Sequence, residues 1–404
     1  MLSILFALSF SAKLKPIVLI PGAMRSRLEV NSTRDAISYC SHKNRNLAWL
    51  NVFSFVPPFI NCFFDYFALD YDEEKGISHS KENVTIKPQG NFGELDNLIG
   101  TGPKIFGKRL FGYLGVFIDR LKEIGYIEKQ NLFAAPYDWR LGVAHLGDYF
   151  DNLRKLVENA YALNGNTKVH LFSHSLGGWV IYVFLTEKTT PEWRQKYIDG
   201  VTLSAPSWSG SGTALSGFVR HTLPFVPFYK TDRLRDFIDS LGMYHIHLPS
   251  SFYYENDTLI VTKDGQNIKG KDVIKYIKSV FSEKHFKMAE ANFNLTNKPH
   301  KPLDVPTNIA YNSGIKQTMG YDLKRGKSIH MEGDGLVGSK GIDWVCKNWN
   351  KEDLRCHNFN SSSLKFIHQL LPRSKAATDV YLDMIFNGKV PHPTKSTNKA
   401  QDEL

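Results

Sequence analysis

The sequence predicts an α/β fold in which a mostly parallel central sheet is covered by helices on both faces. Short, continuous apolar runs alternate with longer segments whose apolar residues recur at helical spacing, which is typical of such a sheet. Near the middle of the chain, at 168–178, an apolar strand turns directly into an apolar helix through a serine. The length fits a single α/β domain with insertions as well as it fits two independent domains.

The first half of the chain supplies the first strands and helices of this sheet. We expect strands at 16–20 and 132–135 and amphipathic helices over 110–124 and 146–163. The glycine-rich stretch 90–115 is not a dinucleotide loop, because its glycine spacing is wrong and no buried strand precedes it.

The segment Lys168–Gly178 reads Lys-Val-His-Leu-Phe-Ser-His-Ser-Leu-Gly-Gly. A strand that turns sharply into a helix with a serine at the turn is the nucleophile elbow of α/β-hydrolases, and the turn needs small neighbours. Ser173 takes the place of the first glycine in the usual Gly-x-Ser-x-Gly pattern, and its small side chain is sterically tolerable. Ser175 is therefore the candidate nucleophile. The alternative is an ordinary strand–turn–helix with a polar turn.

The second half of the chain completes the sheet after an interruption. We expect strands at 201–204, 306–311 and 364–368 and a closing helix over 376–387. Between 211 and 304 the alternation is lost, and an insertion at this point would lie over the active site as a lid or cap. The alternative is an insertion with a purely structural role.

An α/β-hydrolase needs an acid and a histidine after the serine in chain order. Asp334 lies between two glycines in a tight turn after the penultimate strand, where the acid belongs; the alternative is a solvated turn aspartate. His368 follows the last predicted strand, where the base belongs, and His357 beside Cys356 is its rival. An imidazole suits the task because its ordinary pKa of about 6.5 lets it take and return a proton near neutral pH.

Two backbone N–H groups are candidates for an oxyanion hole. The loop 21–26 follows the first strand and would lie beside the elbow, which makes the amide of Ala23 a candidate by position. The second candidate is the amide of Leu176, directly after the nucleophile.

An unusually aromatic segment lies between Cys40 and Cys62. A disulfide between these two cysteines would tether the segment as a surface insertion, and a large apolar patch of this kind binds a partner. We predict docking onto lipid, and the alternative is a core helix. The expected lipid-binding residues are Trp49, Leu50, Val52, Phe53, Phe55, Phe59 and Ile60.

Other features point to the secretory pathway. The apolar stretch at 1–12 resembles a short signal peptide, the alternative being a buried N-terminal strand. The four cysteines fall into two local pairs, Cys40–Cys62 and Cys346–Cys356, as disulfides would. The chain ends in Gln-Asp-Glu-Leu, one residue away from an endoplasmic-reticulum retrieval signal. Glycosylation acceptors occur at Asn31, Asn83, Asn256, Asn294 and Asn360.

The charge and composition limit the partners. The 404 residues are 42% hydrophobic and contain no apolar run long enough for a membrane span. The net charge is +10, but the basic residues are scattered and no nucleic-acid-binding motif accompanies them. We therefore expect attraction to an anionic membrane surface, the alternative being a solvated basic surface without a partner. No metal site is expected, because Cys40-x-His42 and Cys356-His357 lack zinc-ligand spacing. We expect no cofactor and a monomer, and the sequence does not identify a protein activator.

Taken together, the motifs identify a family. The chain resembles the lecithin:cholesterol acyltransferase and lysosomal phospholipase A group of α/β-hydrolases over most of its length. In chain order, the motifs that carry the resemblance are Pro21-Gly22 with Leu28-Glu29, Trp49-Leu50-Asn51, Pro136-Tyr137-Asp138-Trp139-Arg140, His174-Ser175-Leu176-Gly177, Asp199-Gly200 with Ala205-Pro206-Ser207-Trp208, Gly333-Asp334-Gly335 with Val337, and His368. The departures are Ser173 for Gly or Ala, Leu336 for the usual Thr, and Ala23 where the family often has an acidic residue. The oxyanion role needs only the backbone of Ala23.

The resemblance implies that Ser175, Asp334 and His368 form the triad and that Ala23 and Leu176 give the oxyanion-hole amides. It also implies that part of 209–245 is a mobile lid. The implied reaction is calcium-independent removal of an acyl chain from a phospholipid, with water or a lipid alcohol as acceptor. The alternatives are an esterase acting on another lipid ester and a non-catalytic lipid-binding protein on a hydrolase scaffold.

The expected division of the chain follows from these assignments. It comprises a signal peptide at 1–12, an α/β-hydrolase core at 13–39, 68–208 and 305–390, a membrane-binding subdomain at 40–67, a lid or cap at 209–304 and a tail at 391–404.

Overall fold

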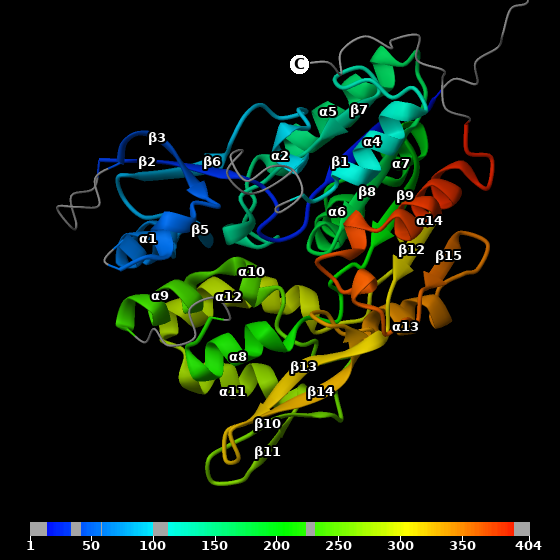
Figure 1. The fold of residues 1–404 in the computed structure, drawn as a ribbon. Coiled ribbons are helices and arrows are strands. Elements are labelled where there is room, and N and C mark those ends of the chain that lie inside the picture. The colour runs from blue at the N-terminus through cyan, green and yellow to red at the C-terminus, as the bar shows by residue number, and fades with distance from the viewer. Residues whose placement is uncertain (1–13, 34–41, 58, 100–111, 224–230, 392–404) are drawn as a thin grey trace, which may run out of the picture.

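The protein is seen here in a computed structural model that describes residues 14–33, 42–57, 59–99, 112–223 and 231–391. A large sheet with its helices occupies the upper part of Figure 1, and a group of helices with a smaller sheet lies below it. A third, smaller group of elements lies beside these two, around the helix α1.

The central sheet has the strand order β15-β12-β9-β8-β1-β7. Every pair of neighbours in it is parallel, which confirms the predicted α/β class. Its strands are β1 (Ile17–Ile20), β7 (Leu132–Ala134), β8 (Val169–His174), β9 (Ile198–Ser204), β12 (Thr307–Tyr311) and β15 (Leu354–Asn358). The run that forms β1 is apolar because both faces of this strand are buried, and β8 is buried along its whole length as well.

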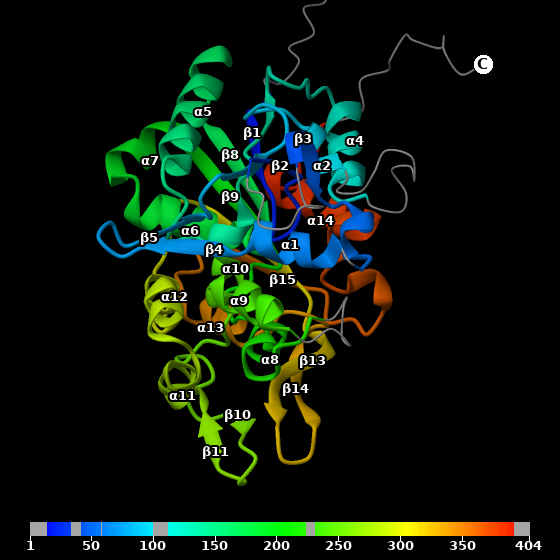
Figure 2. The same cartoon turned by 90° about the vertical axis from the view of Figure 1, so that its left-hand side faces the viewer.

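Helices cover both faces of this sheet, as Figure 2 shows. On one face, α5 and α6 pack against β8 and α7 packs against β9, whereas α4 and α14 cover the other face. The bounds are α2 (Asp96–Ile99), α4 (Gly115–Glu123), α5 (Tyr149–Leu163), α6 (Gly177–Glu187), α7 (Pro191–Tyr197), α13 (Lys340–Asn348) and α14 (Lys375–Phe386). A parallel sheet with helices on both faces is the predicted architecture. The helix α6 is buried along most of its length, where it packs on β8 and β1.

The last strand of the sheet differs from the prediction. Residues 364–368 do not form a strand: they begin with the 3₁₀ turn η5 (Leu364–Phe366), in which Leu364 is 72% exposed. The edge strand is β15, which pairs with β12. Residues 364–368 have a strand-like apolar pattern, but the backbone N–H of His368 donates to the Asp334 carbonyl rather than to a strand of the central sheet.

The lower group in Figure 1, which we call the cap, combines helices with a sheet of order β11-β10-β13-β14. Its elements are α8 (Gly212–Arg220), α9 (Asp232–Ser240), α10 (Gly242–His245), β10 (Thr258–Val261), β11 (Asn267–Lys269), η4 (Gly270–Asp272), α11 (Val273–Val280), α12 (Glu283–Thr296), β13 (Gly314–Asp322) and β14 (Lys327–Asp334). The strands β13 and β14 lie beyond residue 304, so this sheet joins the predicted insertion at 209–304 to two strands of the following segment.

The third group contains the sheet β3-β2-β6, the hairpin β4–β5 and the helix α1. Its elements are β2 (Leu28–Ser32), β3 (His42–Trp49), η1 (Val52–Phe55), α1 (Phe59–Phe67), β4 (Leu69–Asp72), β5 (Ile77–Ser80) and β6 (Val84–Pro88). The helix α1 packs on α9 of the cap, where the ring centroids of Phe64 and Phe237 lie 5.2 Å apart. Within the described ranges, no helix has both the length and the apolar composition that crossing a bilayer requires.

Candidate active site

Ser175 stands at a sharp turn between β8 and α6, as predicted. Its φ of 57° lies in the left-handed region, which a residue other than glycine rarely adopts. The turn needs a glycine two residues later, because a Cβ on Gly177 would lie 2.7 Å from the Ile20 carbonyl oxygen. Ser173, which replaces the first glycine of the pattern, is fully buried at the end of β8, and its hydroxyl has no partner among the described residues.

The structure brings Ser175, His368 and Asp334 together, although 193 residues separate the first two in the chain. The Oγ of Ser175 lies 2.8 Å from Nε2 of His368, and Nδ1 of His368 lies 2.6 Å from Oδ2 of Asp334. A carboxylate accepts but does not donate, so Nδ1 carries the proton and Nε2 is free to accept the proton of the serine. All three residues are buried.

Asp334 is held in position by its own turn. Its other oxygen, Oδ1, accepts hydrogen bonds from the amides of Leu336 (3.2 Å) and Val337 (2.8 Å). Asp334 ends β14, which pairs with β13 in the sheet of the cap. The acid therefore does not follow a strand of the central sheet, and the cap sheet supplies it instead.

His368 follows the turn η5 and precedes η6 (Leu371–Arg373). Its backbone N–H donates to the Asp334 carbonyl at 2.9 Å, so the two loops are joined by both main chain and side chain. The rival His357 lies on β15 with its ring against Phe359, and it makes no contact with Ser175. Its neighbour Cys356 forms the predicted disulfide with Cys346. The predicted partner of Cys62, Cys40, lies outside the described residues.

The two candidate oxyanion amides come from the loop after β1 and from the residue that follows Ser175. Within the described part of the chain, neither the N–H of Ala23 nor that of Leu176 donates a hydrogen bond. Ala23 lies in a turn closed by the hydrogen bond from the Arg25 amide to the Gly22 carbonyl (3.3 Å). The indole N–H of Trp49 donates to the Met24 carbonyl of this turn at 2.8 Å.

The residue before the nucleophile connects the two loops that surround it. Burial lowers the pKa of His174 well below its ordinary value, so the imidazole is neutral. Its Nε2 lies 3.2 Å from the His368 carbonyl, which only accepts, and its Nδ1 therefore accepts from the Tyr113 hydroxyl at 3.1 Å. The Tyr113 hydroxyl in turn accepts from the Gly22 amide at 2.9 Å. A hydrogen-bonded chain thus runs from the turn of Ala23 to the loop of His368.

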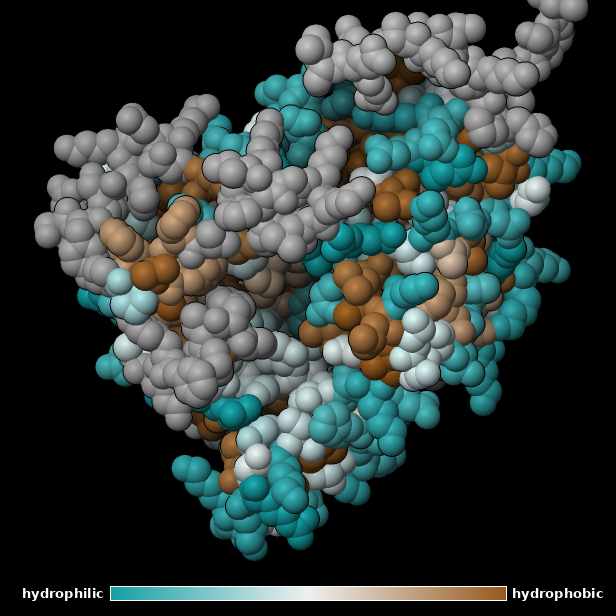
Figure 3. Space-filling model, viewed as in Figure 1, coloured by the Kyte–Doolittle hydropathy of each residue, from teal (hydrophilic) through white to brown (hydrophobic). Residues whose placement is uncertain are grey.

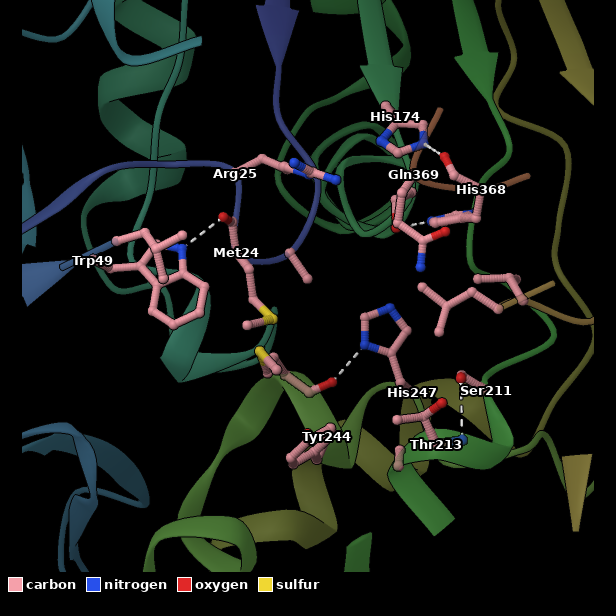
Figure 4. Close-up of a pocket in the computed structure, with 17 residues that line it drawn as sticks. Met24, Arg25, Trp49, His174, Ser211, Thr213, Tyr244, His247, His368 and Gln369 are labelled. Carbon is pink, nitrogen blue, oxygen red and sulfur yellow. Dashed lines mark hydrogen bonds between the residues drawn. The ribbon is translucent and has the colours of Figure 1, made fainter. Parts of the chain in front are cut away.

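A cavity of about 350 Å³ opens over Ser175 and His368 (Figure 4). Its lining is largely apolar, and among the residues that give it this character are Met24, Trp49, Leu50, Ala214, Met243, Leu336 and Val337. His247 also faces the cavity. Burial lowers its pKa to about 4, and its ring is held by the Met243 carbonyl and the Ser207 hydroxyl. Three residues around the site were not identified from the sequence: Tyr113, His247 and Arg25, the last of which also lines this cavity. Of these three, only Arg25 could have been identified from the sequence, because it belongs to the loop 21–26 expected beside the elbow.

The predicted lipid-binding residues separate into two sets. Phe53 is 72% and Phe59 48% exposed, and Figure 3 shows apolar side chains gathered on the side of the molecule where α1 lies. Trp49 and Ile60 are buried, so the prediction of a surface position is wrong for these two: Trp49 packs between the turn of Met24 and the aromatic core. Leu50 lines the cavity, Phe55 is half-buried, and the side chain of Val52 lies outside the description. The inner face of α1 is core, as the alternative interpretation expected.

Comparison with known proteins decides the family. The profile of the lecithin:cholesterol acyltransferase family matches residues 44–316, more than half of the chain. The chain belongs to this family. The phosphatidylcholine-sterol acyltransferase of Gallus gallus is 27% identical, with 85% of this chain and 84% of that protein aligned. The lysosomal phospholipase A and acyltransferase of Bos taurus is 25% identical, with 83% of each aligned.

Similarity among solved structures supports the fold. The crystal structure of the Tle4–Tli4 complex superposes with a TM-score of 0.54 over 93% of this chain and 98% of that chain, at 12% identity. At this identity the superposition shows a shared fold alone. The family profile ends before Asp334 and His368, so the assignment of these two residues depends on the geometry of the site.

Proposed function

We propose that this member of the lecithin:cholesterol acyltransferase family removes an acyl chain from a phospholipid at a membrane surface and passes it to water or a lipid alcohol. The observation that carries the proposal is the hydrogen-bonded path Ser175–His368–Asp334 beside an apolar cavity. A serine hydroxyl is a weak nucleophile unless a base takes its proton, and this path supplies the base and its orienting acid.

The geometry accommodates each step of acyl transfer. The Ser175 oxygen attacks the ester carbonyl while Nε2 of His368 accepts the hydroxyl proton. The N–H groups of Ala23 and Leu176 stabilise the resulting oxyanion. The C–O ester bond then breaks, and His368 returns its proton to the departing lysophospholipid oxygen. Water or an alcohol next attacks the acyl-serine and gives its proton to His368, which restores the Ser175 hydroxyl when the acyl bond breaks. These groups supply nucleophile, base and oxyanion donors, so we propose a calcium-independent reaction.

A covalent probe tests the nucleophile directly. A fluorophosphonate, which forms a P–O bond with an activated serine and releases fluoride, should label the protein once, on the peptide that contains Ser175. Ser173→Ala is the matched control, because this nearby hydroxyl is buried and does not contact His368. We expect the control to be labelled and Ser175→Ala to remain unlabelled in mass spectrometry. Labelling that persists in Ser175→Ala contradicts the assignment.

The exposed aromatic face is proposed to dock on lipid. Phe53, Val56 and Phe59 are 72%, 53% and 48% exposed, and they follow closely on Trp49 and Leu50, which line the cavity. A membrane that received these side chains would lie beside the entrance to the active site, where a phospholipid could enter. Basic residues scattered over the surface would add attraction to anionic lipid.

The double variant Phe53→Ser with Phe59→Ser should bind vesicles about 10- to 100-fold more weakly. Binding of this variant no longer transfers two large apolar side chains from water into the lipid. Hydrolysis of a soluble ester should stay unchanged, since neither residue contacts Ser175. Leu163→Ser is the control: it removes a side chain that is 67% exposed at the end of α5. Co-sedimentation with vesicles measures the effect. Equal binding by the double variant and the control would overturn the docking face.

We also propose a location in the secretory pathway. The disulfide between Cys346 and Cys356 is of a kind that persists in oxidising compartments. The Bos taurus relative is named as a lysosomal protein, which is consistent with this route.

A further inference from the structure

Arg25 places a guanidinium in the wall of the active-site cavity. It lines the same cavity as Ser175 and His368, two residues after the candidate oxyanion amide of Ala23. In Figure 4 its side chain extends from the loop after β1 toward the side of the cavity where His174 and Gln369 lie. The mechanism above does not use this group.

The guanidinium lacks a carboxylate partner among the described residues. The two arginines that are buried in the described part of the chain, Arg140 and Arg194, pair with Asp138 at 2.6 Å and Asp304 at 2.8 Å, whereas Arg25 is partly exposed. Arg25 instead lies over the Tyr113 ring, 5.1 Å from its centroid. Burial lowers the pKa of Arg25, and the neighbouring charge of Arg373 acts in the same direction. An arginine held in this way remains charged and is open to an anionic ligand.

No other fixed charge faces this cavity among the described lining residues. His174 and His247 are neutral near pH 7, because burial lowers the pKa of both. Asp334 lies behind His368 and is bonded to it and to two amides. Gln369 adds an exposed side-chain amide beside His368. The cavity thus combines apolar walls with one unpaired cation and a neutral donor, which is complementary to a molecule with acyl chains and one anionic group.

We infer that Arg25 binds the phosphodiester group of the phospholipid whose ester is attacked by Ser175. The inference rests on the proposed function and adds a reason why the enzyme would prefer a phospholipid substrate to a neutral glyceride. In a phospholipid one glycerol carries both the ester and the phosphate, so a single molecule can present the carbonyl to Ser175 and the anion to Arg25. The planar guanidinium donates two parallel hydrogen bonds to phosphate oxygens. A diacylglycerol of the same chains offers the ester without the anion.

The test compares phosphatidylcholine with diacylglycerol of the same acyl chains in neutral detergent micelles. The wild type should prefer phosphatidylcholine. Arg25→Gln should lower kcat/KM for phosphatidylcholine about 10- to 100-fold, mostly through KM, and leave diacylglycerol within about twofold. Arg25→Lys should retain part of the preference, since lysine keeps the positive charge but lacks the two parallel N–H donors of the guanidinium. Lys122→Gln, which removes an exposed charge on α4, is the control and should behave like the wild type.

Other results would overturn the inference. If Arg25→Gln lost equal activity on both lipids, Arg25 would instead stabilise the turn of Ala23. If the variant kept the wild-type preference for phosphatidylcholine, Arg25 would have no role in substrate binding. Inorganic phosphate that inhibits the wild type but not Arg25→Gln, in a protein that does not distinguish the two lipids, would identify a site for free phosphate instead. Hydrolysis of p-nitrophenyl butyrate separates the two levels: a wild type that cleaves neither lipid nor this soluble ester contradicts the proposed function itself.

Discussion

Replacement of His368 by alanine should lower kcat for ester hydrolysis by about 10⁴- to 10⁶-fold, as losses of the base from serine triads do. His368 is the residue that contacts both the Ser175 hydroxyl and the Asp334 carboxylate, at 2.8 and 2.6 Å. Without it, the serine has no proton acceptor and the acid has nothing to orient. Residual activity would come from the oxyanion amides and from binding alone.

His357→Ala is the matched control, because His357 is the rival candidate for the base and its ring lies against Phe359 rather than in the site. It should keep activity within about twofold, as surface substitutions away from such features change little. His368 is buried, so His368→Gln, which fills more of its volume, separates lost catalysis from lost packing. Thermal unfolding monitors the fold of each variant, and p-nitrophenyl butyrate measures kcat. Full activity in His368→Ala with loss in His357→Ala would reverse the assignment.

Ser175→Ala should lower kcat for the same soluble ester by about 10⁶-fold, because no acyl-enzyme forms. The fold should survive, since alanine is smaller than serine and every backbone hydrogen bond of the turn, including that from the Ser175 amide to the Ser204 carbonyl, is kept. The backbone φ of 57° at this position is no less favourable for alanine than for serine, because both residues carry a Cβ. Melting temperature and near-ultraviolet circular dichroism check this. A variant that is folded and still hydrolyses the ester at a wild-type rate would exclude Ser175 as the nucleophile.

Features coded by neighbouring residues were predicted from the sequence. The strand β8, the turn at Ser175 and the helix α6 form one continuous segment, so apolar pattern and turn chemistry were sufficient to locate them. The parallel sheet followed from the alternation of strands and helices. The positions of Asp334 and His368 followed from chain order, which the hydrolase fold fixes.

Features that depend on pairing between distant segments were not predictable. Residues 364–368 have a strand-like pattern, yet the edge strand β15 is formed by 354–358, and residues 364–366 form a 3₁₀ turn. Nothing near Asp334 in the sequence shows that its strand belongs to the cap sheet. The strand β14 forms a hairpin with β13, and this hairpin joins the cap through the pairing of β13 with β10, about sixty residues earlier in the chain. The bond from Tyr113 to His174 likewise joins residues 61 positions apart.

The central claim is that Ser175 drives acyl release from phospholipid at a membrane, and one measurement tests it most directly. Fatty-acid release from phosphatidylcholine vesicles is followed in the presence of EDTA, with wild type and folded Ser175→Ala compared at equal vesicle binding. We expect release by the wild type alone and, when a lipid alcohol is added, diversion of acyl chains into its ester. Release by neither protein while both bind the vesicles, or equal release by both, would contradict the claim.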